Sequence, residues 1–156
     1  MKIELKPIGE VKSCFKNPQD LHFACEKGRL ADTESRILID KDFAEGLEGL
    51  EEFSHIWVIY HLHNANRIEL TTYPGPPNIK NLTNVGVFAS RSQHRPNHLA
   101  LRMAGLIKIN GMEMTVSGLD AIDGSPVLDI KPYIPFFDRA EIVRLAKFYE
   151  WTEGRA

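Results

Sequence analysis

The sequence contains few cysteines, no long apolar run and no excess of positive charge. The two cysteines, Cys14 and Cys25, are too few for a disulfide framework, which favours a reducing, cytoplasmic location. No segment approaches the ~20 apolar residues that a membrane helix needs, and the first residues do not begin a signal peptide, so we expect no membrane partner. The formal net charge of −2 argues against indiscriminate nucleic-acid binding but leaves room for a local basic patch.

Several catalytic motifs are also missing. No Gly-x-Gly-x-x-Gly follows an expected strand, so a Rossmann-type cofactor site has no support, and no Ser-His-Asp or Cys-His set suggests a covalent nucleophile. What remains is typical of a globular protein: 156 residues, 43% of them hydrophobic and 26% charged. We therefore expect a single domain over residues 1–156 with one sizeable core.

Short apolar or alternating runs dominate the chain and predict strands. They lie at residues 3–11, 36–40, 54–62, 85–89, 100–109, 112–119 and 125–130. Asn110-Gly111 is the strongest hairpin signal. The fold class predicted is mainly β, a small single β-barrel, closed or partly closed, with a short helix near residues 43–50 and a C-terminal helix.

The C-terminal helix is expected to begin at Asp138, with Glu141 completing a capping box. Its apolar stripe of Ile142, Leu145 and Tyr149 predicts core packing, with a dimer contact as the alternative. Residues 12–35 have no clear period and are expected to form a long loop. Residues 64–84 are polar and proline-rich, and we interpret them either as a lid or RNA-contacting arm or, equally, as a plain connection.

Residues 54–62 are apolar on both faces and predict a central strand. His61 and His63 would then share one face, which is compatible with metal ligation. No cysteine or acidic cluster completes such a site nearby, so we favour a role in lining a cleft or packing as neutral groups, and we predict no metal.

A polar loop between two of the expected strands concentrates the functional candidates. It carries, within eight residues, Arg91, His94, Arg95, Asn97 and His98. A guanidinium suits a carboxylate or a phosphate. Pro96 also restricts the loop backbone. The alternative is a solvated connection whose arginines pair with surface acids.

The motif Arg91-Ser92-x-x-Arg95-Pro96-Asn97 resembles the signature of the TsaA/TrmO family, also called YaeB or UPF0066. The segments Pro7-Ile8-Gly9, Phe53-Ser54-His55-Ile56-Trp57 and Asp123-Gly124-Ser125-Pro126 through Tyr133 resemble other family motifs in the same order. The resemblance implies a small β-barrel and an S-adenosylmethionine-dependent methyltransferase that acts on a modified adenosine next to the anticodon of tRNA. The alternatives are a non-catalytic module that binds S-adenosylmethionine or a nucleotide, and a methyltransferase for a small molecule or a protein.

The resemblance also implies roles for individual residues. The nucleoside part of S-adenosylmethionine would be held by His63 and Asn64, and its carboxylate or ribose by Arg91. The adenine side would be lined by Leu101 and by the backbone of Ile122, Asp123, Gly124 and Ser125. Asn97 and Arg95 are the catalytic candidates, with Asp129 as a weaker one that we expect to brace the loop. The candidates for tRNA phosphates are Arg102, Lys108 and Lys131, with Arg95.

Methyl transfer from a sulfonium is an in-line displacement that needs alignment more than a nucleophilic side chain. Orientation alone can supply ~7–11 kcal/mol of the barrier. A barrel of this size encloses little volume for both donor and acceptor, so we also expect a homodimer. Splayed bases of an anticodon loop are of the kind that proteins recognise by stacking and edge contacts.

Overall fold

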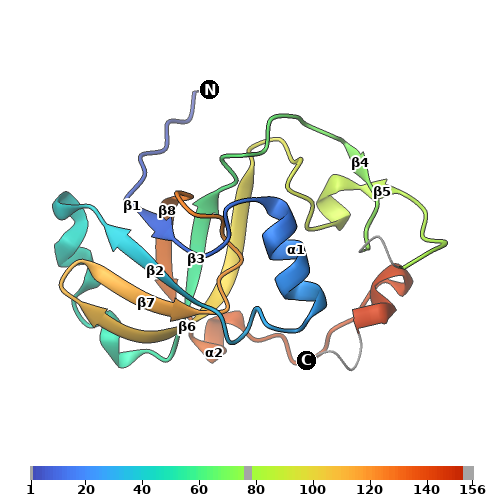
Figure 1. Cartoon of the computed structure of the whole chain (residues 1–156). Helices are drawn as coiled ribbons and strands as arrows, with labels where there is room; N and C mark the ends of the chain where they lie inside the picture. Colours follow the sequence, from blue (N-terminus) through green and yellow to red (C-terminus); the bar gives the residue numbers. More distant parts are fainter. Residues whose placement is uncertain (1, 76–78, 153–156) are drawn as a thin grey trace. The chain divides into compact units, whose positions relative to one another are not determined.

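The computed structural model describes residues 2–75 and 79–152 (Figure 1). Its contacts divide the chain into two compact units. We call Met1–His63 with Leu99–Ile134 the barrel unit, and Asn64–His98 with Pro135–Ala156 the loop unit. The single domain over residues 1–156 stays a prediction.

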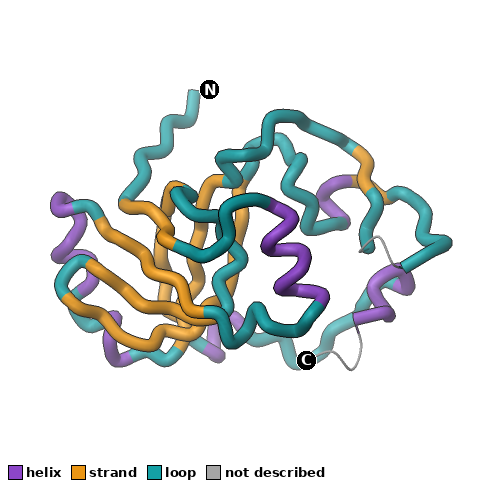
Figure 2. Tube along the Cα trace, in the orientation of Figure 1, coloured by secondary structure: helices purple, strands orange, loops and turns teal. Residues whose placement is uncertain are grey.

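Six antiparallel strands close into a barrel in the barrel unit (Figure 2). Their order is β1 (Gly9–Lys12), β2 (Glu34–Ile39), β7 (Glu113–Ser117), β6 (Leu99–Asn110), β3 (His55–His61) and β8 (Pro126–Pro132), which pairs with β1 again. The expected fold class, mainly β with a small barrel, is confirmed. The strand predicted at residues 3–11 is shorter than expected, since pairing begins only at Gly9.

The central position of β3 is confirmed, because it pairs with β6 on one side and β8 on the other. Ile56, Val58 and Tyr60 point into the core and are at most 2% exposed. The same core contains Val11, Ile37, Met114, Val116, Leu119 and Val127. The alternation places these three side chains on one face of the strand, and the structure shows that this face is the inner one.

The hairpin at Asn110-Gly111 is also confirmed: it joins β6 to β7, and Gly111 takes a φ of 60°. An irregularity between Leu106 and Lys108 shifts the register of this pair. The helix expected near residues 43–50 exists as two 3-10 helices, η1 (Lys41–Leu47) and η2 (Leu50–Glu52).

The long loop predicted at residues 12–35 is wrong, because α1 (Pro18–Glu26) lies within it. Asn17 caps this helix: its side chain accepts a hydrogen bond from the backbone N–H of Asp20, and the Asp20 carboxylate accepts one from the N–H of Asn17. Ala24 is the buried residue of the helix and packs in a small cluster with Phe15 and Leu30. Because so little of the helix is buried, its sequence shows only a weak helical period of apolar residues.

The loop unit contains a two-stranded sheet of β4 (Thr71–Thr72) and β5 (Val85–Gly86). The strand predicted at 85–89 is therefore too long, since Val87–Ala89 forms the 3-10 helix η3. Part of the polar segment 64–84, residues 76–78, lies outside the described residues, and its role as lid or arm stays a prediction.

The C-terminal helix does not begin at Asp138 as predicted. A short α2 (Pro135–Asp138) ends there, and a 3-10 helix η4 follows at Lys147–Thr152. Ile142 is 93% exposed and Leu145 42% exposed, so the expected core packing is wrong. A short helix needs a buried face to be stable, and two of the three residues of this stripe are exposed. No helix among the described residues has the length and apolar character to cross a membrane.

Candidate functional site

The turn before β8 is fixed to β1 by backbone hydrogen bonds. The N–H of Gly124 donates to the carbonyl of Val11 at 2.7 Å, and the N–H of Val11 donates to the carbonyl of Ser125 at 2.9 Å. Gly124 adopts a φ of +78°, in the left-handed region that favours glycine. The Asp-Gly-Ser motif thus builds a rigid turn at one end of the barrel.

Asp123 is held on both carboxylate oxygens. Its Oδ1 accepts from the N–H of Ser13 at 3.0 Å, and its Oδ2 lies 2.8 Å from Nζ of Lys16. The Lys16 ammonium, followed by the Ser13 N–H, holds the pKa of Asp123 below its ordinary value. The carboxylate is therefore charged at neutral pH. It stabilises the turn, in addition to any contact that it makes with a ligand.

His63 and Ser125, both predicted to contact the cofactor, are brought together. Nδ1 of His63 lies 3.3 Å from Oγ of Ser125, whose side chain is 2% exposed, while His63 is exposed. Within the described residues, no three histidine, cysteine, aspartate or glutamate side chains are placed to hold a metal ion. The pair presents an imidazole beside a buried hydroxyl.

The predicted residues Leu101, Arg102, Lys108 and Lys131 lie on strands of the barrel unit, whereas Ile122 lies in the turn before β8, where its carbonyl accepts from the N–H of Ser125 at 3.1 Å. Leu101 is on β6 and 48% exposed, and Lys108 is exposed further along the same strand. Arg102 donates from Nε to the carbonyl of Gly118 at 2.9 Å, which ties it to the barrel. Lys131 on β8 forms an ion pair of 2.9 Å with Asp129, whose other oxygen accepts from the N–H of Ile130.

In the loop unit, Arg95 braces the loop that carries the signature motif. Its Nη1 donates to the carbonyls of Ser90 and Ser92, both at 3.3 Å. The Ser90 hydroxyl accepts from the N–H of Ser92, and the Ser92 hydroxyl accepts from the N–H of His94. One face of the Arg95 guanidinium is therefore occupied within the loop.

The remaining polar residues of the loop are arranged around this brace. Arg91 and Asn97 are exposed. His98 takes a φ of 49°, and its ring nitrogen lies 3.0 Å from the carbonyl of Arg67. Nδ1 of His94 is buried without a hydrogen-bond partner among the described residues, which marks a polar group that a ligand could satisfy.

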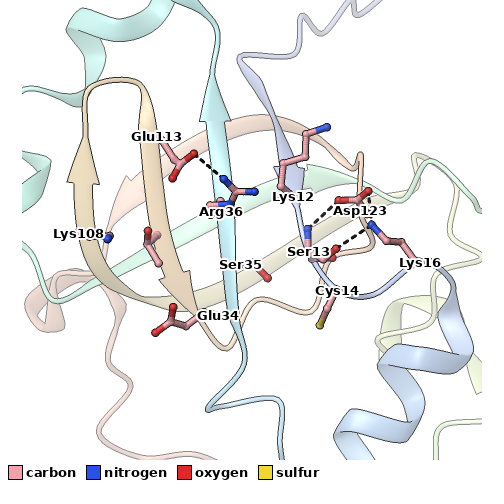
Figure 3. Close-up of a pocket in the computed structure, with 11 residues that line it drawn as sticks. Lys12, Ser13, Cys14, Lys16, Glu34, Ser35, Arg36, Lys108, Glu113 and Asp123 are labelled. Atoms are coloured by element: carbon pink, nitrogen blue, oxygen red, sulfur yellow. Dashed lines mark hydrogen bonds and ion pairs between the residues drawn. The ribbon is translucent and has the colours of Figure 1, made fainter.

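Sequence reasoning missed Ser13 and Lys16, the two partners of Asp123. No motif marks them, and the contact spans more than a hundred residues of sequence. It also missed Ser35 and Arg36, which line a polar pocket of about 610 Å³ together with the predicted residues Lys108 and Asp123 (Figure 3).

Comparison with known proteins identifies the family of this chain. The family model of the tRNA-methyltransferase O N-terminal domain matches residues 10–139, most of the chain. The chain belongs to the TrmO N-terminal domain family. The matched range includes the signature loop, β3 and the turn at Gly124 of this TrmO-family chain, and the resemblance inferred from its motifs is confirmed.

Individual relatives agree. A probable S-adenosyl-L-methionine-binding protein of Methanothermobacter thermautotrophicus is 42% identical over 88% of this TrmO-family chain and 95% of its own length. The tRNA (adenine(37)-N6)-methyltransferase of mouse is 38% identical over 85% of this chain but only 31% of its own. A crystal structure of TrmO from Pseudomonas aeruginosa superposes with a TM-score of 0.69 at 31% identity, over 92% of this chain and 62% of that one. The chain thus spans less than two thirds of the latter two proteins.

Proposed function

We propose that this chain binds S-adenosylmethionine and transfers its methyl group to the N6 atom of an adenine in tRNA, next to the anticodon. The observation that carries the proposal is the family relationship over residues 10–139, which includes every motif singled out from the sequence except Pro7-Ile8-Gly9. The archaeal relative is named for binding the donor and the mouse relative for this methyl transfer.

The side chains at the predicted cofactor positions fit S-adenosylmethionine chemically. In the barrel unit, the imidazole of His63 beside the Ser125 hydroxyl suits ribose hydroxyls, and the exposed side chain of Leu101 suits an adenine face. In the loop unit, Arg91 and Asn64 stay the predicted partners of the donor's carboxylate and nucleoside. The orphaned Nδ1 of His94 is a further polar group available in that unit.

S-adenosylmethionine, when bound, would supply an electrophilic methyl carbon: the S–CH₃ bond would break as the N6–C bond forms, the sulfonium would become a neutral thioether, and the N6 proton would pass to solvent. The chain's own residues would orient the adenine and exclude water. Asn97, exposed on a loop braced by Arg95, is the proposed contact to the adenine. Alignment of this kind is the main demand of an in-line transfer.

Calorimetric titration of S-adenosylmethionine into the purified chain tests donor binding, with adenosine and methionine as controls. We expect saturable binding that Arg91→Ala or His63→Ala weakens about tenfold or more, in line with a lost hydrogen bond to a charged or buried group. Transfer of a labelled methyl group to tRNA transcripts, with and without the target adenosine, then tests the reaction. Absence of binding up to millimolar donor would contradict the proposal.

A second candidate is a binding module that holds S-adenosylmethionine without transferring the methyl group. It is favoured by the near-full-length match to an archaeal protein named for binding alone. Asn97→Ala separates the two: an enzyme loses transfer while keeping donor affinity, whereas a module shows no transfer before or after the substitution.

A homodimer and a cytoplasmic location form part of the proposal. The outer side of β3 and β6 pairs Trp57 with Met103 and Ile59 with Leu101, and both β6 side chains are more than 40% exposed. An apolar strip of this kind supports pairing with a second copy. Analytical ultracentrifugation of Met103→Glu against the unmodified chain tests the dimer, and microscopy of the tagged protein tests the location.

A further inference from the structure

A polar pocket opens on the barrel unit where β1 ends its pairing with β2. That pairing stops at Lys12 and Arg36, after which Ser13 and Cys14 leave the neighbouring strand. The pocket, of about 610 Å³, lies between these segments and extends across β7 to β6 (Figure 3). We call it the row pocket. None of the motifs that carry the family resemblance, apart from Asp123, contributes to it.

Three cations and a hydroxyl form a transverse row across four neighbouring strands of this pocket. Lys12 on β1 pairs in register with Arg36 on β2, Arg36 with Thr115 on β7, and Thr115 with Lys108 on β6. Paired residues of neighbouring strands point to the same side of a sheet, about 4.8 Å apart. The row is therefore about 14 Å long between the backbones of Lys12 and Lys108.

The cations of the lining are the groups that an anion could contact. Four cations (Lys12, Lys16, Arg36, Lys108) line the pocket beside three carboxylates (Glu34, Glu113, Asp123), and Glu10, which pairs with Lys12, makes the two kinds of charge equal in number. Arg36 pairs with Glu113 at 3.1 Å, Lys16 with Asp123 at 2.8 Å, and Lys12 with Glu10 at 2.6 Å. Lys108 has no ion-pair partner within the described part of the chain.

These ion pairs do not close the site. Arg36, Lys12 and their partners are exposed by a third or more, and exposed pairs of this kind are weak and easily exchanged. A phosphate accepts a bidentate bond from a guanidinium and charge-assisted bonds from lysines, so it competes well with a single surface carboxylate.

We propose that the row pocket binds phosphate groups along the backbone of the RNA substrate, on the barrel face of β1, β2, β7 and β6. The inference rests on the proposed function for the identity of that RNA. A row of about 14 Å can contact more than one phosphate of a strand, so it positions the RNA without reading its sequence. Arg36 and Lys108 would supply the principal contacts.

The test compares two double variants that remove the same charge. Arg36→Gln with Lys108→Gln alters the row, while Lys2→Gln with Lys41→Gln alters exposed lysines outside the pocket. Binding of a fluorescein-labelled tRNA transcript is followed by anisotropy between about 0.05 and 0.2 M KCl. We expect the row variant to bind about tenfold more weakly and its salt slope to be shallower by about two, one for each lost contact. Equal effects of both double variants, or none, would overturn the proposal.

Two further measurements distinguish a failure of the row-pocket proposal from a failure of the proposed function. If adenosine monophosphate competes with tRNA at equal phosphate concentration, the pocket takes a free nucleotide and the RNA assignment is overturned. Donor calorimetry and methyl transfer are measured on the same proteins. If the chain does not bind the donor but tRNA binding still depends on the row residues, the methyltransferase proposal alone is overturned. If methyl transfer is intact and the row variant has no effect on tRNA binding, the row-pocket proposal alone is overturned.

Discussion

Lys16 places its ammonium group 2.8 Å from Oδ2 of Asp123, a contact that spans 107 residues of sequence. It ties the segment after β1 to the turn before β8, and it lowers the pKa of Asp123. A carboxyl whose pKa is lower in the folded state adds stability above its unfolded pKa of about 3.9, and this stability is lost as the pH falls through the folded pKa.

Asp123→Asn is therefore expected to destabilise the chain by about 1 kcal/mol at pH 7, a modest value because the side chain is 30% exposed. The difference should shrink towards zero at strongly acidic pH, where both proteins lack the charge. Urea unfolding at several pH values measures this, with Asp32→Asn as the control at an exposed acid. A difference that stays constant with pH would contradict the assigned ion pair.

Gly9 is required where β1 passes close to β2. A Cβ at this position would collide with the carbonyl oxygen of Leu38, a backbone atom that cannot move aside. This explains physically why the Pro-Ile-Gly segment ends in glycine. Gly9→Ala is expected to cost about 1–3 kcal/mol of unfolding free energy, the range for overpacking.

Gly46→Ala is the matched control, since a Cβ there meets nothing within 4 Å. Thermal unfolding of both variants measures the difference. Equal melting temperatures would show that β1 and β2 separate at no cost.

The elements that could be predicted from the sequence are those with local signals. β3 followed from its alternation, and the β6–β7 hairpin from Asn110-Gly111. The C-terminal helix was predicted wrongly for the opposite reason: Asp138 and Glu141 formed a convincing local cap in the sequence, but Ile142 is exposed and buries no apolar surface. Local signals suffice only where burial agrees with them.

The candidate site, too, could be predicted only in part. The pair of His63 and Ser125 lies at positions that the family motifs had indicated. The row pocket could not be predicted, because Lys12, Arg36 and Lys108 meet only through strand register, and a shift of one residue would move each side chain to the other face.

The cap of α1 can be tested by itself. Asn17→Ala removes the side-chain acceptor of the Asp20 N–H and one half of the capping box, and it should destabilise the chain by about 1 kcal/mol. Gln19→Ala, an exposed position in the first turn, should have little effect. Urea unfolding compares the two, and equal midpoints would mean that packing of Ala24 alone fixes the helix.

Arg95 and Arg91 are expected to act differently although they share one loop. Arg95 donates to two carbonyls of the loop itself, and hydrogen bonds of charged groups contribute about 1.5–3 kcal/mol. Arg95→Gln should therefore speed hydrogen exchange of the Ser92 and His94 amides about tenfold in the absence of any ligand. Arg91→Gln is expected to weaken donor binding instead. If both variants loosen the loop equally, Arg91 is a second brace and its assignment to the donor carboxylate loses support. If neither does, the loop is held by its serine hydroxyls, and Arg95 is left available to contact substrate directly.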